Sequence, residues 1–76
     1  MQANPPSVPA ARAYLTRPHD TVRVQYNGTH ARPNGYALYF TVVWSGARSA
    51  VIVKLCEDRR GRVVGSSSIS DGEPSC

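Results

Sequence analysis

Two apolar runs in the second half of the chain predict a β-hairpin. Residues 36–44 (YALYFTVVW) and 50–56 (AVIVKLC) are rich in the β-branched and aromatic side chains that favour strands. Ser45-Gly46 lies between them and is typical of a turn. With these two residues as the loop, the predicted cross-strand pairs are Phe40 with Val51, Leu38 with Val53, Tyr36 with Leu55, and Tyr39 with Ile52.

Alternation along the two strands gives the hairpin two different faces. One face matches large apolar residues across the strands and is the predicted core: Tyr36, Leu38, Phe40, Val42, Val51, Val53 and Leu55. The other face is too apolar to be left in water, and we expect it to consist of Ala37, Tyr39, Thr41, Val43, Ile52, Lys54 and Cys56, joined by Val63.

The first half of the chain predicts a short helix and one further strand. Ser7 is a good helix cap, residues 8–16 carry a narrow apolar stripe, and Pro18 ends the helix. Residues 21–26 alternate, which predicts a half-buried strand with Val22, Val24 and Tyr26 towards the core: TVRVQY. Two glycines and a proline make residues 27–35 a long predicted loop.

A weak fourth strand completes the predicted sheet. Residues 58–61 (DRRG) suit a type I turn with Gly61 in the left-handed position, and residues 62–69 then form an edge strand. The expected fold class is α+β, with a short N-terminal helix packed on a four-stranded antiparallel meander sheet. We expect residues 1–76 to form one small domain, with residues 1–6 a loose arm and residues 70–76 a tail.

Charge adds a preference for acidic partners. The chain has nine basic and five acidic residues, and Lys54 is its only lysine. Arginine suits planar contacts to carboxylates and phosphates, although arginine in place of lysine is also typical of GC-rich codon usage. Arg23 and Lys54 are expected to flank the apolar face, and Arg59, Arg60 and Arg62 cluster at the last turn.

The two cysteines leave the compartment open. A Cys56–Cys76 bridge would contribute about 3 kcal/mol to a domain of this size. The alternative is one buried thiol and one free thiol. A bridge would place the protein in a secreted or periplasmic compartment, and free thiols would place it in the cytoplasm. Neither a signal peptide nor an apolar run of about 20 residues is evident in the sequence.

Catalytic chemistry is not predicted. Adjacent His19-Asp20 follows the helix and His30 lies in the expected loop, so both histidines are interpreted as loop residues rather than as a base or metal ligands. The serines at 66–68 are interpreted as a polar edge strand. We therefore expect neither an enzyme nor a cofactor or metal site.

These patterns favour a non-enzymatic binding domain that contacts another protein through the second face, as an inhibitor, immunity or assembly module does. The predicted contact residues are Arg23, Tyr39, Val43, Ile52, Lys54, Arg59, Arg60 and Arg62. The alternative is sequence-tolerant nucleic-acid binding, with a base stacked on Tyr39 and phosphates held by the cations. A third hypothesis is a structural homo-oligomer, and the C-terminal tail could also cover this face.

Overall fold

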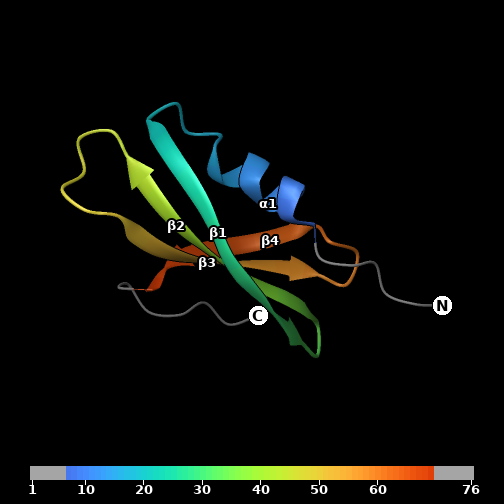
Figure 1. The fold of residues 1–76 in the computed structure, drawn as a ribbon. Helices are drawn as coiled ribbons and strands as arrows, with labels where there is room; N and C mark the ends of the chain where they lie inside the picture. Colours follow the sequence, from blue (N-terminus) through green and yellow to red (C-terminus); the bar gives the residue numbers. More distant parts are fainter. Residues whose placement is uncertain (1–6, 70–76) are drawn as a thin grey trace.

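The chain folds as one helix on an antiparallel meander, which confirms the predicted fold class. The computed structural model describes residues 7–69, so the arm at 1–6 and the tail at 70–76 lie outside the described residues. The elements are α1 (Val8–Leu15), β1 (Thr21–Arg32), β2 (Gly35–Trp44), β3 (Val51–Asp58) and β4 (Val63–Ser68). The strands lie side by side in chain order, β1-β2-β3-β4, with α1 on one side of the sheet (Figure 1).

Helix α1 begins where the sequence predicts. The Ser7 hydroxyl accepts a hydrogen bond from the Ala10 N–H at 3.2 Å, and Pro9 occupies the first turn, where its missing N–H costs nothing. The backbone N–H of Ser7 donates to Glu57 Oε1 at 2.8 Å, which fixes the start of the helix on β3. Ala11 and Leu15 are the buried helix residues that pack on the sheet.

One face of the sheet forms the core beneath α1. Buried residues from the helix and the two central strands make the cluster: Ala11, Leu15, Leu38, Phe40, Val42, Val53 and Leu55. Tyr36 and Val51 are half-buried and pack against it, so all seven predicted core positions of the hairpin lie on this face. Val63 also packs here, and the expectation that it joins the opposite face is wrong.

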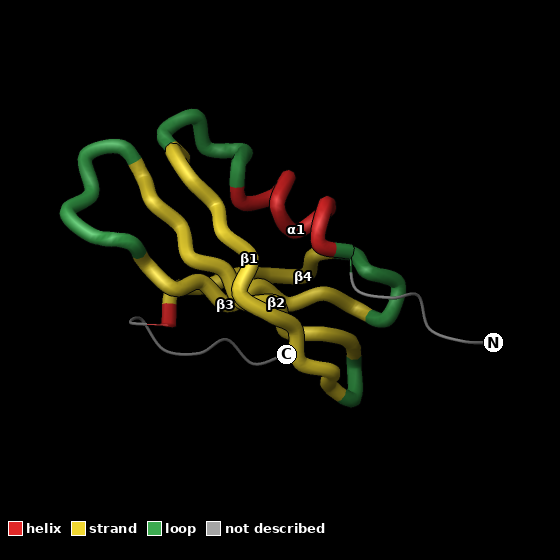
Figure 2. The backbone as a smooth tube through the Cα atoms, viewed as in Figure 1, coloured by secondary structure: helices red, strands yellow, loops and turns green. Residues whose placement is uncertain are grey.

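The β2–β3 register differs from the predicted one by two residues. Phe40 pairs with Val53 rather than Val51, and Tyr39 pairs with Lys54 rather than Ile52. The loop is not the two residues Ser45-Gly46 but the whole of 45–50, seen as the long green segment in Figure 2. Because side chains alternate with a period of two, a shift of two residues leaves both faces of the hairpin unchanged.

Strand β1 is twice as long as predicted, and the expected loop at 27–35 is wrong. The strand continues to Arg32, which pairs with Gly35 across a tight turn of Pro33 and Asn34. The register shifts between Thr21 and Arg23 and again between Tyr26 and Gly28, so Val22 and Asn27 are extra residues in β-bulges.

The first bulge also changes which side chains of β1 face the core. Val22 is 67% exposed, and its predicted position in the core is wrong. Val24 does pack against the core cluster, and the ring of Tyr26 lies 5.5 Å from that of Phe40. On the outer edge of the same strand, Arg12 Nη1 of α1 donates to the Val24 carbonyl at 2.9 Å.

The turn from β3 to β4 has the predicted form. Gly61 has a φ of 78°, the left-handed value that glycine adopts without strain. The Gly61 N–H donates to the Asp58 carbonyl at 3.0 Å, and the Asp58 carboxylate accepts from the backbone N–H groups of Arg60 and Arg62. β4 follows as a short edge strand.

Candidate binding surface

The face of the sheet opposite α1 is the candidate functional surface, and we call it the second face. The strand registers place on it Arg23, Gln25 and His30 of β1; Ala37, Tyr39, Thr41 and Val43 of β2; Ile52, Lys54 and Cys56 of β3; and Gly65 and Ser67 of β4. Apart from the expected Val63, this set contains every residue that the sequence pattern assigns to this face of the hairpin.

The second face divides into a buried part and an open part. Ala37, Lys54 and Cys56 form the buried part, and the side chain of Lys54 is only 1% exposed. They are cross-strand neighbours, since Ala37 pairs with Cys56 and Lys54 pairs with the adjacent Tyr39. Lys54 therefore lies on the predicted face, but it is not an accessible cation at its rim.

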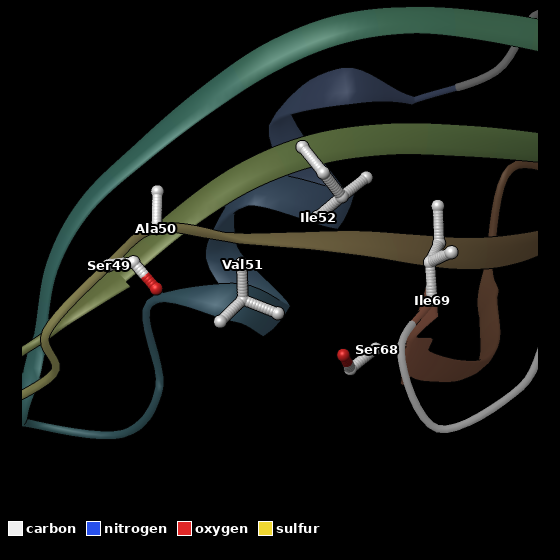
Figure 3. Close-up of a pocket in the computed structure, with 6 residues that line it drawn as sticks. All are labelled: Ser49, Ala50, Val51, Ile52, Ser68 and Ile69. Carbon is white, nitrogen blue, oxygen red and sulfur yellow. The ribbon is translucent and has the colours of Figure 1, made fainter.

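The open part lies towards the beginning of β3. Ile52 is 42% exposed and pairs with Thr41, while Val43 pairs with the exposed Arg23. Figure 3 shows Ile52 and Val51 pointing to opposite sides of β3. A shallow pocket of about 400 Å³ is lined here by Ser49, Ala50, Val51, Ile52, Ser68 and Ile69.

Tyr39 joins the two parts and has a partner on β1. Its ring contacts the His30 ring edge-to-face, with the centroids 5.5 Å apart. Nearby, Asn27 Nδ2 donates to Thr41 Oγ1 at 2.8 Å. Sequence reasoning missed both contacts because it placed Asn27 and His30 in a loop, although the alternation of β1 continues past the second bulge.

The three arginines of the last turn lie at the other end of the sheet from Ile52. Asp58, where the turn starts, is six residues along β3 from Ile52, about 20 Å in an extended strand. Arg59 donates to the Pro33 carbonyl at 2.7 and 3.2 Å, and Arg62 Nε lies 3.4 Å from Asp58 Oδ2. The structure therefore does not bring this turn together with the open part of the second face.

Two carboxyl groups have shifted pKa values, and neither lies on the open part. Burial raises the pKa of Glu57, with the Ser7 N–H opposing the shift, and Oε2 of this side chain is buried without a hydrogen-bond partner among residues 7–69. The backbone N–H of Arg62 leads the contacts that lower the pKa of the half-buried Asp58. Within residues 7–69, no three His, Cys, Asp or Glu side chains gather closely enough to hold a metal ion.

Comparisons with known proteins find no matching family model, curated protein or solved structure. The only helix among residues 7–69 is too short to cross a membrane. The open part combines an exposed isoleucine, half-buried aromatic and aliphatic neighbours and an adjacent arginine, and this combination suits burial against another macromolecule.

Proposed function

We propose that this protein is a non-enzymatic binding domain of the inhibitor, immunity or assembly-module type. It acts by burying the open part of its second face against another protein. Ile52, Val43 and Tyr39 supply the apolar contact, and Arg23 supplies a charge at the rim that favours an acidic partner.

One observation carries this proposal: the apolar side chains continue on the side of the sheet that α1 does not cover. Ile52 is 42% exposed although β3 is a central strand of the sheet, and it lies opposite Thr41 and one strand from Val43. A sheet face that meets only water normally alternates to polar residues. Apolar residues rimmed by a cation are typical of protein interfaces.

Site-specific photo-crosslinking in the native host tests this proposal. A photoreactive amino acid replaces Ile52 in one variant and Val64 in the control, because Val64 is 64% exposed but lies at the bulge of β4. We expect position 52 alone to give a discrete adduct that mass spectrometry identifies.

The purified partner should then bind Ile52→Arg at least tenfold more weakly than Val64→Arg, a loss of about 1.4 kcal/mol. Equal crosslinking from both positions, or unchanged affinity of Ile52→Arg, would contradict the proposal.

Nucleic-acid binding is the second candidate, favoured by a half-buried Tyr39 ring and an exposed Arg23 on the same face of the sheet. The burial of Lys54 and the intramolecular bonds of Arg59 and Arg62 reduce the cationic surface that this function needs. Fluorescence anisotropy with a mixed oligonucleotide at low salt separates the two proposals. Binding that falls steeply with salt and is lost in Arg23→Ala would replace the protein-binding proposal.

A second copy of the chain is the third candidate occupant of the open part. Sedimentation equilibrium distinguishes it, since a dimer mass that Ile52→Arg converts to a monomer mass would make the partner another copy. A monomer at high concentration would exclude this form of the proposal.

A further inference from the structure

A groove on the core side of the sheet is open between α1 and β4. Ser66 of β4 pairs with Leu55, so its small side chain lies on the core side, where a larger apolar residue would fill the space against α1. Two pockets of about 370 and 430 Å³ lie here, one reaching Ser66 and the other Val63. Tyr14 and Arg17 line both pockets, which together form one groove that we call the α1–β4 groove.

The end of this groove nearest the C-terminus of α1 has an aromatic and apolar lining. Leu15, Pro18, Tyr14 and Trp44 contribute to it. Trp44 packs against the core cluster, and Tyr14 is 37% exposed. Pockets that bind small molecules are mostly apolar and aromatic, begin at about 300 Å³ and carry a few polar groups that orient the ligand. The lining and the volume of this end therefore suit a flat molecule of one or two aromatic rings.

Arg17 is the only charged residue among the described residues that line the groove. Its guanidinium carbon lies 5.9 Å from the centre of the Tyr14 ring, a cation–π contact that leaves the N–H donors at the guanidinium edge accessible. Within residues 7–69 this guanidinium has no hydrogen-bond or ion-pair partner, and neither the Ser66 hydroxyl nor the Trp44 indole N–H has a hydrogen-bond partner. The groove thus offers free donors and a positive charge without an acidic side chain, which favours an anionic ligand.

The end of α1 does not use the Arg17 side chain as a cap. Basic residues near a helix C-terminus often donate to the last carbonyl groups. Here all four of these carbonyls accept from other donors: that of Arg12 from the Thr16 N–H, that of Ala13 from the Thr16 hydroxyl, that of Tyr14 from the Arg17 N–H, and that of Leu15 from the Thr21 hydroxyl. The guanidinium is therefore available for a ligand.

We propose that the α1–β4 groove binds an aromatic carboxylate, with the ring against Tyr14 and Trp44 and the carboxylate paired with Arg17. A carboxylate matches the planar fork of the guanidinium and forms charge-assisted hydrogen bonds with it, whereas a cationic ligand would be repelled. The Ser66 hydroxyl supplies a further donor from β4. The groove lies on the opposite side of the sheet from Ile52, so this site is independent of the proposed partner surface.

Titration of the ¹⁵N-labelled full chain with 2-naphthoate tests the site by NMR. Trp44 is the only tryptophan, so its indole N–H gives a single resonance. We expect this resonance and the amide resonances of Tyr14, Arg17 and Ser66 to shift together and to saturate with a dissociation constant below about 1 mM. The neutral analogue of the same shape, 2-naphthamide, should bind at least tenfold more weakly because it cannot form the ion pair.

Three variants separate the charge from the space. Arg17→Gln should weaken binding of 2-naphthoate at least tenfold and leave that of 2-naphthamide within about twofold of wild type. The matched control is Arg23→Gln, which removes the same charge from the opposite side of the sheet and should bind both compounds as the wild type does. Ser66→Leu should fill the groove and weaken binding of both compounds at least tenfold, while circular dichroism shows an intact fold.

Three results would overturn the site. The first is the lack of a saturable shift at Trp44 up to the solubility limit of 2-naphthoate. The second is unchanged affinity of folded Arg17→Gln or folded Ser66→Leu. The third is a set of shifts centred on Ile52 and Thr41, which would place the ligand on the second face. None of these results depends on crosslinking at position 52, so failure of this site and failure of the partner surface are distinguishable.

Discussion

Gly35 lies so close to β3 that the fold has no room for a side chain at this position. It begins β2 with a φ of 152°, a conformation that L-residues rarely adopt. A Cβ added there would lie 2.0 Å from the Glu57 carbonyl oxygen and 2.8 Å from Asp58 Cα. Since such contacts essentially never fall below 3.0 Å, the backbones of β2 and β3 would have to separate by about 1 Å where Gly35 pairs with Asp58.

The cost of Gly35→Ala follows from these two effects. The strained φ contributes about 1–3 kcal/mol and the steric conflict another 1–3 kcal/mol, together about 2–6 kcal/mol. A domain of this size rarely has more than about 3–5 kcal/mol of net stability. We therefore expect Gly35→Ala to be largely unfolded, or to unfold at far lower urea concentration than the wild type.

Two other glycines separate the two contributions. Gly28 has a φ of 149° but nothing within 4 Å of an added Cβ, so Gly28→Ala should lose only the 1–3 kcal/mol of strain. Gly65 has neither problem, and Gly65→Ala should be neutral or about 0.4–1 kcal/mol more stable. Urea unfolding of all three, followed by Trp44 fluorescence and circular dichroism, measures the series. A Gly35→Ala variant no less stable than Gly28→Ala would refute the close approach of β2 and β3.

Three further variants examine the attachment of α1 to β3 and the contact between the β3–β4 turn and the β1–β2 turn. Ionised Glu57 opposes folding because its pKa is raised in the folded state, so the free energy of unfolding of the wild type should fall as pH rises from 4.5 through that pKa. Urea titrations at several pH values should show that Glu57→Gln flattens this pH dependence. An unchanged pH dependence would contradict the burial of this carboxyl group. Ser7→Ala should cost about 1 kcal/mol through loss of the helix cap, and an unchanged urea midpoint would show that the cap contributes nothing. Arg59→Ala should leave global stability within about 1 kcal/mol but accelerate amide exchange around Pro33, and exchange identical to wild type would contradict the link between the two turns.

The sequence predicted the faces of the sheet better than its lengths. Alternation assigned Phe40 to the core and Tyr39 to the other face, and an error of two residues in the β2–β3 register preserved both assignments. The loop length failed because Ser45-Gly46 is a turn signal whether it closes a hairpin or opens a six-residue loop. Asn27-Gly28 was likewise ambiguous, since the same pair that favours a turn accommodates a bulge.

The composition of the candidate site was predictable, but its exposure was not. Local sequence determines that Lys54 and Ile52 share one face, because they are two residues apart on a strand. Whether each meets solvent depends on distant parts of the chain, and Lys54 is buried while Ile52 is exposed. The separation between Ile52 and the arginines of the β3–β4 turn also became evident only from the arrangement of these strands in the structure.

The two bulges in β1 have a consequence for polymerisation. A twelve-residue edge strand with regular unpaired backbone groups would be a template for adding strands from other molecules, the first step of fibril growth. The bulges at Val22 and Asn27 divide β1 into two short regular stretches, residues 23–26 and 28–32, and Arg12 already occupies the Val24 carbonyl in the first of them. Another chain thus meets no long uninterrupted run of regular backbone along β1, which disfavours extension of the sheet from that edge.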